Sequence, residues 1–449
     1  SNPSSATKKM NKKIKNTNKA QKIYTNSKKI IPGGTMLFSK KPELHLPNLW
    51  PNYFSKVKDC YLWDIDNNKY TDMMFYVGTN PLGYCNKNID KEVIKSIKKG
   101  NLATLNNSEE VVLAKKLIKF HPWAQMVRFA RSGGEANAIA VRIARSVTNK
   151  QNIAVCGYHG WHDWYLAANL NNNKNLDGHI IKGIDTRGIH KNLRNTVYTF
   201  EYGNFDKLNN LVQNKNIGII KMELSRSTYP NIKFLTKIRK LCNRNKIILI
   251  YDECTSGFRE TLGGLHLNYD SFLYPDLAMF GKALGNGYAI NAIIGKNKIM
   301  KNVSDTFISS TFWTEKIGTV AALSTLKEMQ RIKSWKIIKK KGQYIKKNWR
   351  ILFDKYNIKV KISGIDSLPS FTFEKHNQLR KTYFTQEMLR NGYLASNIVY
   401  VSTAHKEKIL KDYFKIFESV IKSISQNDPN KLKNLLESSL CETGLRRLN

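Results

Sequence analysis

The middle of the chain alternates short apolar runs with amphipathic segments. Between about residues 120 and 310, each apolar run is followed by a turn, and several turns lead into segments with apolar positions at helical spacing. Apolar strands that alternate with helices indicate a mostly parallel sheet covered by helices on both faces. The predicted strands are 126–130, 152–156, 217–222, 246–252, 276–280 and 291–295. One predicted helix begins near Gly134, and another spans 235–245.

The pattern differs on either side of this region. Residues 57–77 alternate apolar and polar positions around an Asp-Asn-Asn turn, which predicts a β-hairpin. Residues 108–120 predict a helix with Ser108 as its N-cap. After Thr311 we expect long helices over 317–350, short strands within 356–375 and 393–403, and a closing helix over 404–424.

A chain of 449 residues exceeds the size at which single cores usually stop growing, so we expect more than one domain. The predicted parts are a tail, helix and strands over 1–75 that join the small domain, a large α/β domain over 76–330, and a small α+β domain over 331–449. The first residues are polar and basic and lack the apolar core of a secretory signal, so a tail that becomes helical near Ala20 is expected. No apolar run approaches the roughly 18 residues that span a membrane.

The charge and the cysteine content of the chain bear on its partners and its location rather than on its fold. The 74 Lys and Arg residues against 34 Asp and Glu residues give a net charge of +40, which raises the question of nucleic-acid or membrane binding. The lysines are spread along the chain without interleaved aromatics or zinc-finger spacing, so no nucleic acid is expected as partner. Attraction of an anionic substrate is the alternative role of this charge. Six cysteines without a CxxC pair predict reduced thiols and a cytoplasmic location.

Ligands of open α/β sheets gather at the carboxyl ends of strands, and four predicted ends carry unusual residues. The first end holds Ser132, Gly133 and Gly134, between a strand and a helix. Free N–H groups at a helix start bind anions, and glycine lets a phosphate approach the backbone. A simple glycine-rich turn is the alternative interpretation.

The second end holds Tyr158, His159 and His162, directly after the strand 152–156. An aromatic ring there could stack on a planar ligand, or it could belong to the core. The two histidines raise the question of a metal, but no cysteine or carboxylate cluster completes such a site, so no metal is expected.

The third and fourth ends hold Asp252 and Lys282. A carboxylate at the end of a buried strand needs a cationic partner, and a structural salt bridge with Arg259 is the alternative to a functional role. Lys282 follows an apolar strand and is surrounded by glycine, and a partly buried lysine becomes a usable nucleophile. Together the four ends meet the requirements of pyridoxal 5′-phosphate: a phosphate site, a stacking ring, a carboxylate for the pyridine nitrogen and a lysine for the Schiff base.

The chain also resembles the class III aminotransferases of the fold-type-I pyridoxal-phosphate enzymes, in the branch that includes glutamate-1-semialdehyde aminomutase. This resemblance implies a mostly parallel seven-stranded sheet sandwiched by helices in the large domain, and a smaller α+β domain. The motifs that carry it are "IPGGT" (31–35), "RFARSGGEANAIAVRIAR" (128–145), "YHGWHD" (158–163), "YDECTSGFRETLGG" (251–264), "YPDLAMFGKALGNGYAINAIIG" (274–295), "STFWTEKIGTVAALSTL" (310–326) and "LASNIVYVSTAH" (394–405).

The resemblance implies a role for each matching residue. Lys282 would carry the cofactor and shuttle the proton, and Asp252 would bind the pyridine nitrogen. Thr311 would reach the phosphate of the neighbouring subunit, which implies a homodimer with shared active sites. The remaining cofactor-binding residues would be Ser132, Gly133 and Gly134 at the phosphate, Tyr158 on the ring face, and His159 and Glu223 beside them.

The chain departs from the family mainly on the substrate side. Ser39 and Lys40 lie near the place of the substrate-binding arginine of the aminomutase, and Asn397 lies near the place of its C-terminal glutamate. We therefore predict an aminotransferase that moves an amino group, with glutamate as the expected donor, to an aldehyde or ketone by a ping-pong mechanism. An aminomutase or racemase is the alternative within the enzymes, and a basic binding protein without activity is the third hypothesis.

Overall fold

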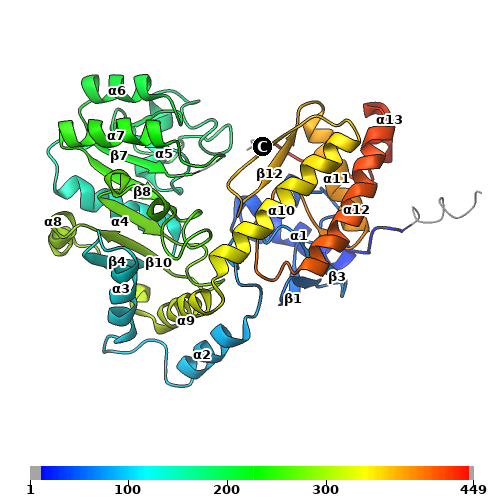
Figure 1. Ribbon diagram of the computed structural model, residues 1–449, viewed down its shortest axis with the longest axis horizontal. Helices are drawn as coiled ribbons and strands as arrows, with labels where there is room; N and C mark the ends of the chain where they lie inside the picture. The colour runs from blue at the N-terminus through cyan, green and yellow to red at the C-terminus, as the bar shows by residue number, and fades with distance from the viewer. Residues whose placement is uncertain (1–11, 226, 444–449) are drawn as a thin grey trace, which may run out of the picture. The chain divides into compact units, whose positions relative to one another are not determined.

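The structure is a computed structural model that describes residues 12–225 and 227–443 (Figure 1). The part of the N-terminal tail before residue 12 lies outside the described residues. The described residues form two compact units, one with 12–77, 83–86 and 340–443, and one with 78–82, 87–225 and 227–339. The division into three parts made from the sequence stays a prediction.

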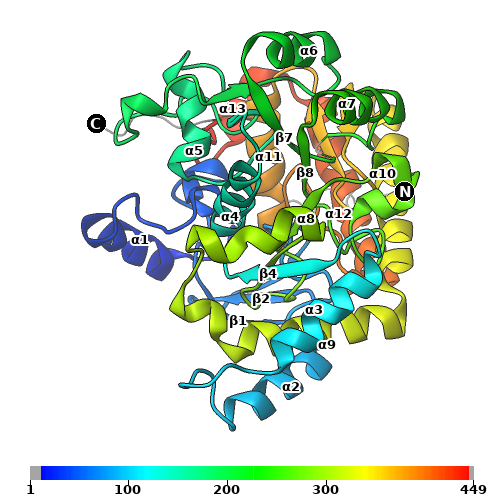
Figure 2. The ribbon, with the colours of Figure 1, turned by 90° about the vertical axis from the view of Figure 1, so that its left-hand side faces the viewer.

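The larger unit is built on a seven-stranded sheet in the order β4-β10-β9-β8-β7-β5-β6 (Figures 1 and 2). β10 runs antiparallel to both of its neighbours, and the other pairs are parallel. The predicted mostly parallel seven-stranded sheet is confirmed. The strands are Met126–Ala130 (β4), Asn152–Cys156 (β5), Val197–Thr199 (β6), Ile217–Glu223 (β7), Ile248–Asp252 (β8), Leu277–Phe280 (β9) and Asn291–Gly295 (β10).

Alternation along the central strands divides the core into two layers, one on each face of the sheet. Leu277 and Met279 of β9 pack in the layer that contains helix α4 (Gly133–Ser146). Ala278 and Phe280 pack in the layer that contains α3 (Glu109–Phe120) and α9 (Lys316–Ile332). Successive side chains of a strand point to opposite faces, so a strand that is apolar at every position is covered on both sides. The remaining helices of this unit are Lys87–Ile97 (α2), Asp163–Leu166 (α5), Phe205–Asn214 (α6), Ile232–Asn245 (α7) and Asn297–Met300 (α8).

Asparagine side chains bind the first turns of two helices in the larger unit. Ser108 occupies the N-cap position of α3, but its side chain makes no capping bond, and Asn107 Oδ1 instead accepts from Glu110 N at 3.2 Å. Helix α7 begins three residues earlier than predicted, because Asn231 Oδ1 accepts from Phe234 N at 2.9 Å. Asparagine satisfies the free N–H groups of a first turn as serine does, and the prediction did not use it.

The smaller unit combines helices with two small sheets, as predicted for an α+β part. In these sheets every strand pair is antiparallel except β3 with β13. The predicted hairpin within 57–77 is confirmed as the pair β2 and β3, whereas the strand predicted within 393–403 is only two residues long. Its strands are Phe54–Lys58 (β1), Tyr61–Asp64 (β2), Lys69–Asp72 (β3), Val360–Ser363 (β11), Ser370–Phe373 (β12) and Tyr393–Leu394 (β13). Its helices are Asn18–Ile30 (α1), most of Ser334–Lys355 (α10), Asn377–Arg390 (α11), Glu407–Gln426 (α12) and Pro429–Leu435 (α13), the last of which was not predicted.

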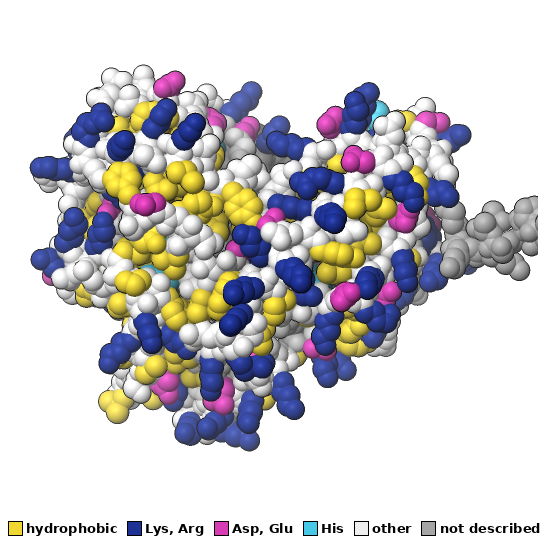
Figure 3. Space-filling view, in the orientation of Figure 1, with side chains coloured by type: hydrophobic (Ala, Val, Ile, Leu, Met, Phe, Trp, Pro, Cys, Tyr) yellow, Lys and Arg dark blue, Asp and Glu magenta, His cyan; other side chains and the backbone are white. Residues whose placement is uncertain are grey.

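The surface carries charge of both signs. Figure 3 shows Lys and Arg side chains spread over the visible face, with Asp and Glu side chains among them. This distribution agrees with lysines that occupy solvated positions throughout the sequence. Within the described part of the chain, no helix has the length and apolar character needed to cross a membrane.

Gly218→Ala is expected to destabilise the larger unit. A Cβ at this position of β7 would lie 1.6 Å from the carbonyl oxygen of Lys150, so the backbone would have to move. Overpacking of this kind costs about 1–3 kcal/mol. Thermal unfolding of the cofactor-free protein measures the loss, and Gly133→Ala is the matched control because its added methyl group meets no atom within 4 Å.

Candidate active site

A cavity of about 360 Å³ lies in the larger unit, where the carboxyl ends of its parallel strands meet. Seven of the residues predicted from the sequence line this one cavity: Ser132, Gly133, Gly134, Tyr158, Glu223, Asp252 and Lys282. The turns that follow parallel strands lie along the same edge of a sheet, which explains how residues 150 positions apart come together. The cavity is also lined by Thr79, Arg131, Asn137, Gly160, Cys254, Thr255, Gly287, Tyr288, Ala289, Ile290 and Asn291.

Lys282 follows the last residue of β9 by two positions and presents its amine to the cavity. Its Nζ donates to Thr255 Oγ1 at 3.1 Å. Burial lowers the pKa of Lys282, and the nearby guanidinium of Arg259 lowers it further. A larger fraction of this amine is therefore neutral than in an exposed lysine, and the neutral amine is the form that attacks a carbonyl.

Asp252 is the last residue of β8, and its carboxylate is buried but still lines the cavity. Oδ1 accepts from the backbone N–H of Cys254 at 3.1 Å. Oδ2 lies 2.9 Å from His159 Nδ1 and 3.3 Å from Lys221 Nζ. Burial opposes ionisation of this carboxyl, but Lys221 first and His159 second hold its pKa below the usual range. Asp252 is thus an ionised carboxylate in a dry setting, as a partner for a protonated ring nitrogen must be.

His159 lies behind Asp252 and is completely buried. Its Nε2 is 2.9 Å from the carbonyl oxygen of Cys156, which can only accept, so Nε2 carries a proton. Burial and the positive charge of Lys221 lower the pKa of His159 to about 4. Both ring nitrogens are therefore engaged by protein groups, which leaves this histidine in a supporting position rather than as a metal ligand.

Glu253 points away from the cavity, because adjacent positions at a strand end face opposite sides. It is completely buried and accepts from Ser256 Oγ at 3.0 Å. The structure therefore places the carboxylate of Asp252, and not that of Glu253, at the cavity.

The residues predicted to bind the phosphate lie at the N-terminus of α4. Ser132 and Glu135 form a capping box, in which Ser132 Oγ accepts from Glu135 N and Glu135 Oε2 accepts from Ser132 N. A Cβ on Gly133 would meet no atom within 4 Å, whereas a Cβ on Gly134 would lie 2.9 Å from the ring of His162. The backbone at Gly133 is therefore open to an anion, and the histidine ring closes the other side of the loop.

Tyr158 is held at the cavity by its backbone. Its N–H donates to Glu223 Oε2 at 3.0 Å, and Glu223 ends the neighbouring strand β7. Gly157 has a φ of +98°, and a Cβ there would lie 2.4 Å from the same Glu223 oxygen. Glycine at 157 thus permits the turn and the close approach that place Tyr158 beside Asp252 and Lys282.

The predicted substrate residues belong to the smaller unit, and their role stays a prediction. Ser39 and Lys40 end a short 3₁₀ helix, Phe38–Lys40, where Ser39 O accepts from His45 Nε2 at 3.0 Å and Lys40 is exposed. Asn397 Nδ2 donates to the carbonyl oxygen of Phe371 at 3.0 Å. Thr311 opens the 3₁₀ helix Thr311–Thr314 (η8) in the larger unit, where it is exposed and lies outside the set of described residues that line the cavity.

The sequence interpretation missed Lys221. It treated residues 217–222 as an apolar strand, and Lys221 in fact points inward from β7 and bonds to Asp252. A lysine inside an otherwise apolar strand is rare unless it is paired, so its position was a usable signal.

The comparisons agree with this geometry. The model of the family "Aminotransferase class-III" matches residues 48–398. A 3-aminobutyryl-CoA aminotransferase of Cloacimonas acidaminovorans is 32% identical over 391 residues, which cover 84% of this chain and 90% of the relative. A glutamate-1-semialdehyde 2,1-aminomutase of Wigglesworthia glossinidia brevipalpis is 32% identical over 372 residues, which cover 80% and 83%. Among solved structures, the FumI protein of Sphingopyxis sp. MTA144 in its PLP internal aldimine form has a TM-score of 0.81 at 21% identity, covering 93% of this chain and 98% of that one.

The chain belongs to the class III aminotransferases, and the family predicted from its motifs is confirmed. It is a pyridoxal-phosphate-dependent enzyme of fold type I, as predicted. The residues present fit this cofactor, because the cavity offers an open glycine at a helix start, an ionised buried carboxylate and an amine of lowered pKa. The individual roles of these residues are taken up below as proposals.

Ser132→Ala is expected to weaken the phosphate site. Loss of the N-cap should cost about 1 kcal/mol of stability and loosen the first turn of α4. We expect weaker binding of pyridoxal phosphate and no change for pyridoxal, which lacks the phosphate. Fluorescence titration with both compounds measures this, and Ser146→Ala, at the far end of the same helix, is the control.

Proposed function

We propose that this protein is an aminotransferase in which Lys282 attaches the cofactor and moves the proton, while Asp252 holds the ring nitrogen. The observation that carries the proposal is the shared cavity: the amine of lowered pKa and the ionised carboxylate line one space together with the start of α4. When bound, pyridoxal phosphate supplies an electron sink for the carbon that loses its proton.

The remaining work falls to residues of this chain. Ser132, Gly133 and Gly134 would hold the phosphate at the start of α4, and Tyr158 would cover one face of the ring. Thr255 Oγ1 accepts from Lys282 at 3.1 Å, which keeps the amine turned into the cavity between proton transfers. Glu223 fixes the turn that carries Tyr158. These contacts support positioning of the reacting groups, which is a main source of catalysis in such sites.

The donor proposed is glutamate, and the acceptor is an aldehyde or ketone, with Ser39, Lys40 and Asn397 as candidate substrate residues. An isomerase remains the second candidate, because one of the relatives is a glutamate-1-semialdehyde 2,1-aminomutase. An aminomutase or racemase returns the amino group to the same carbon skeleton, so it does not release a keto acid.

A half-reaction assay separates these candidates. The cofactor-loaded protein is mixed with single amino acids, and the release of keto acid is measured against the amount of cofactor. One keto acid per cofactor supports the aminotransferase. Turnover of glutamate-1-semialdehyde, a diamine or one amino-acid enantiomer without keto acid would instead support the isomerase.

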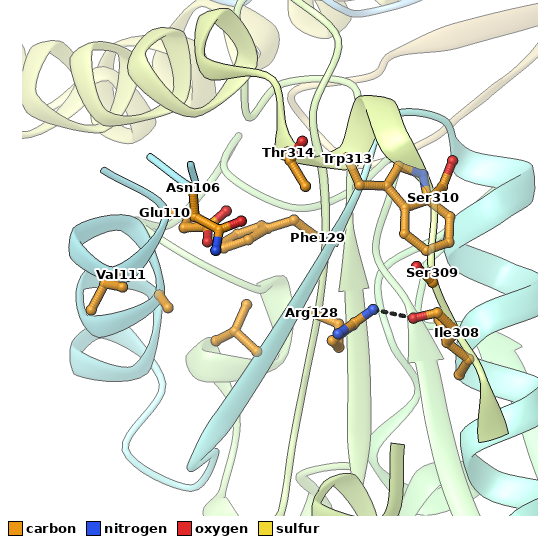
Figure 4. Close-up of a pocket in the computed structure, with 12 residues that line it drawn as sticks. Asn106, Glu110, Val111, Arg128, Phe129, Ile308, Ser309, Ser310, Trp313 and Thr314 are labelled. Carbon is orange, nitrogen blue, oxygen red and sulfur yellow. Dashed lines mark hydrogen bonds between the residues drawn. The ribbon is translucent and has the colours of Figure 1, made fainter. Parts of the chain in front are cut away.

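We further propose a homodimer that shares its active sites through Thr311. A cavity of about 470 Å³ lies beside β4 in the larger unit, and Figure 4 shows Val111 of α3, Phe129 of β4 and Trp313 of η8 around it. The guanidinium of Arg128 donates to Ile308 O at this cavity. Large apolar side chains on the same segments are exposed, with Leu105 at 83%, Phe307 at 85% and Phe312 at 71%. Clustered apolar side chains of this kind usually mark an interface, and Thr311 is adjacent to Phe312.

Mixing two inactive variants tests the shared site. Lys282→Ala and Thr311→Ala proteins are dissociated, mixed and reassociated. If Thr311 completes the partner's site, each mixed dimer has one site with both residues intact, and activity rises above that of either variant. If Thr311 acts within its own chain, mixing restores no activity.

We also propose a cytoplasmic location for the protein. All six cysteines are free thiols, which is the state expected in a reducing compartment.

A further inference from the structure

Lys221 is a fully buried cation directly behind the active-site carboxylate. It lies in β7, a strand whose other residues from Ile217 to Met222 are apolar or glycine and buried. Its Nζ donates to Asn137 Oδ1, lies 2.9 Å from His159 Nδ1 and lies 3.3 Å from Asp252 Oδ2. A lysine without solvent contact persists in a fold only when its ammonium is paired and hydrogen-bonded, and these three acceptors meet that condition.

The proton positions in this cluster follow from its acceptors. Nε2 of His159 already donates to the carbonyl oxygen of Cys156, so a neutral ring presents a lone pair at Nδ1. Nδ1 can accept from Lys221 or, if protonated, donate to Asp252, but it cannot do both. A protonated ring would place two cations on one carboxylate in a dry setting, so the favoured arrangement has Lys221 as the cation and His159 as a neutral acceptor.

Lys221 also connects the carboxylate to the phosphate site. Asn137 accepts from Lys221 with its side-chain oxygen and donates from Nδ2 to the carbonyl oxygen of Gly133 at 2.7 Å. One chain of hydrogen bonds therefore runs from Asp252 through Lys221 and Asn137 to the start of α4. Asp252 and Gly133 both line the cavity, so these hydrogen bonds fix the positions of its two ends relative to each other.

We propose that Lys221 is a positioning residue that keeps Asp252 ionised and oriented, and thereby keeps the proton on the ring nitrogen of the cofactor. Asp252 lines the cavity and Lys221 is buried behind it, so a ring nitrogen in the cavity is farther from the ammonium than the carboxylate is. The ammonium consequently stabilises the negative carboxylate more than it opposes the positive ring. The proton shared by Asp252 and the ring nitrogen can lie on the nitrogen, which gives an ion pair, or on Asp252, which gives a neutral pair. Lys221 favours the ion pair. This inference rests on the proposed contact between Asp252 and the ring nitrogen.

The test uses the full chain loaded with pyridoxal phosphate that carries ¹⁵N in its ring. Lys221→Met keeps the length of the side chain and removes the charge. We expect the nitrogen signal of the bound cofactor to move toward that of a neutral pyridine, and the affinity for the cofactor to fall about 10- to 100-fold, as for loss of a charged hydrogen bond. An unchanged nitrogen signal would overturn the proposal. Lys240→Met, at an exposed position of α7, is the control and should behave as wild type.

Parallel variants separate this inference from the proposed function. Asp252→Asn must move the nitrogen signal if Asp252 holds the ring nitrogen, and an unchanged signal there contradicts the proposed function itself. If Asp252→Asn moves the signal and Lys221→Met does not, only the role of Lys221 is wrong. A purely structural lysine would lower the melting temperature of the cofactor-free protein without moving the signal.

A second variant covers the case in which Lys221→Met does not fold. His159→Gln keeps an acceptor for Lys221 and removes the imidazole. Because Lys221 remains, we expect the ring nitrogen to stay protonated in this variant. A signal that moves as far as in Asp252→Asn would show that His159, not Lys221, maintains the carboxylate, and would overturn the proposal.

Discussion

Lys282→Ala is expected to lower amino transfer by at least about 10³-fold, because one side chain performs both covalent attachment and proton transfer. A positioned acid–base group alone contributes about 10²- to 10⁴-fold, and the variant loses the attachment as well. The measurement is keto-acid release from glutamate or the best donor in a single turnover. Mass spectrometry after borohydride reduction provides a second readout, because reduction makes the bond between lysine and cofactor permanent in wild type only.

The control for this prediction is Lys298→Ala, at an exposed position of α8 in the same unit. It should retain both the activity and the mass increase on reduction. A Lys282→Ala protein that transfers amino groups at the wild-type rate would contradict the assignment of the amine. So would a wild-type protein whose added mass maps to another lysine of the cavity region.

Six of the seven strands of the larger sheet, and the place where their ends meet, could be predicted from the sequence for a physical reason. Runs such as 153–156 and 277–280 are apolar at every position because helices cover both of their faces, and that pattern is visible without coordinates. Polar residues directly after such strands must lie at one edge of the sheet, which is why Tyr158, Asp252 and Lys282 were correctly placed together.

The parts that the sequence did not predict depend on contacts between distant segments. The bond from Tyr158 N to Glu223 and the bond from Lys221 to Asp252 join residues 65 and 31 positions apart, and no local pattern encodes either. From the sequence, Arg259 was the expected partner of Asp252 in a structural salt bridge, whereas the structure shows Lys221 and His159 at its Oδ2. Short β6, with three residues, has too few positions for alternation to be recognised.

The buried pair also predicts a large effect on stability. Asp252→Ala leaves Lys221 buried without its carboxylate, and loss of one partner of a buried ion pair costs about 3–5 kcal/mol. Lys221→Met should cost less, because Asp252 keeps the backbone N–H of Cys254 and the neighbouring His159 as partners and still lines the cavity. The double variant should be more stable than the sum of the single losses by about 1–3 kcal/mol, as residues in one network are not additive. Urea unfolding of the cofactor-free proteins at pH 7 measures the three free energies, and an additive result would contradict the pairing.

The pH dependence of the same variants gives an independent test with a defined sign. In wild type the pKa of His159 is about 4, below its ordinary value of 6.5, so the unfolded chain binds more protons between these pH values and stability rises with pH across that window. His45, His121 and His405 have the same lowered pKa of about 4 and contribute the same slope in every variant. Lys221→Met removes the neighbouring positive charge, which raises the pKa of His159 while Asp252 still faces it. The rise in stability between pH 4 and 6.5 should therefore be smaller in Lys221→Met than in wild type, and an identical slope would mean that Lys221 carries no charge in the folded protein.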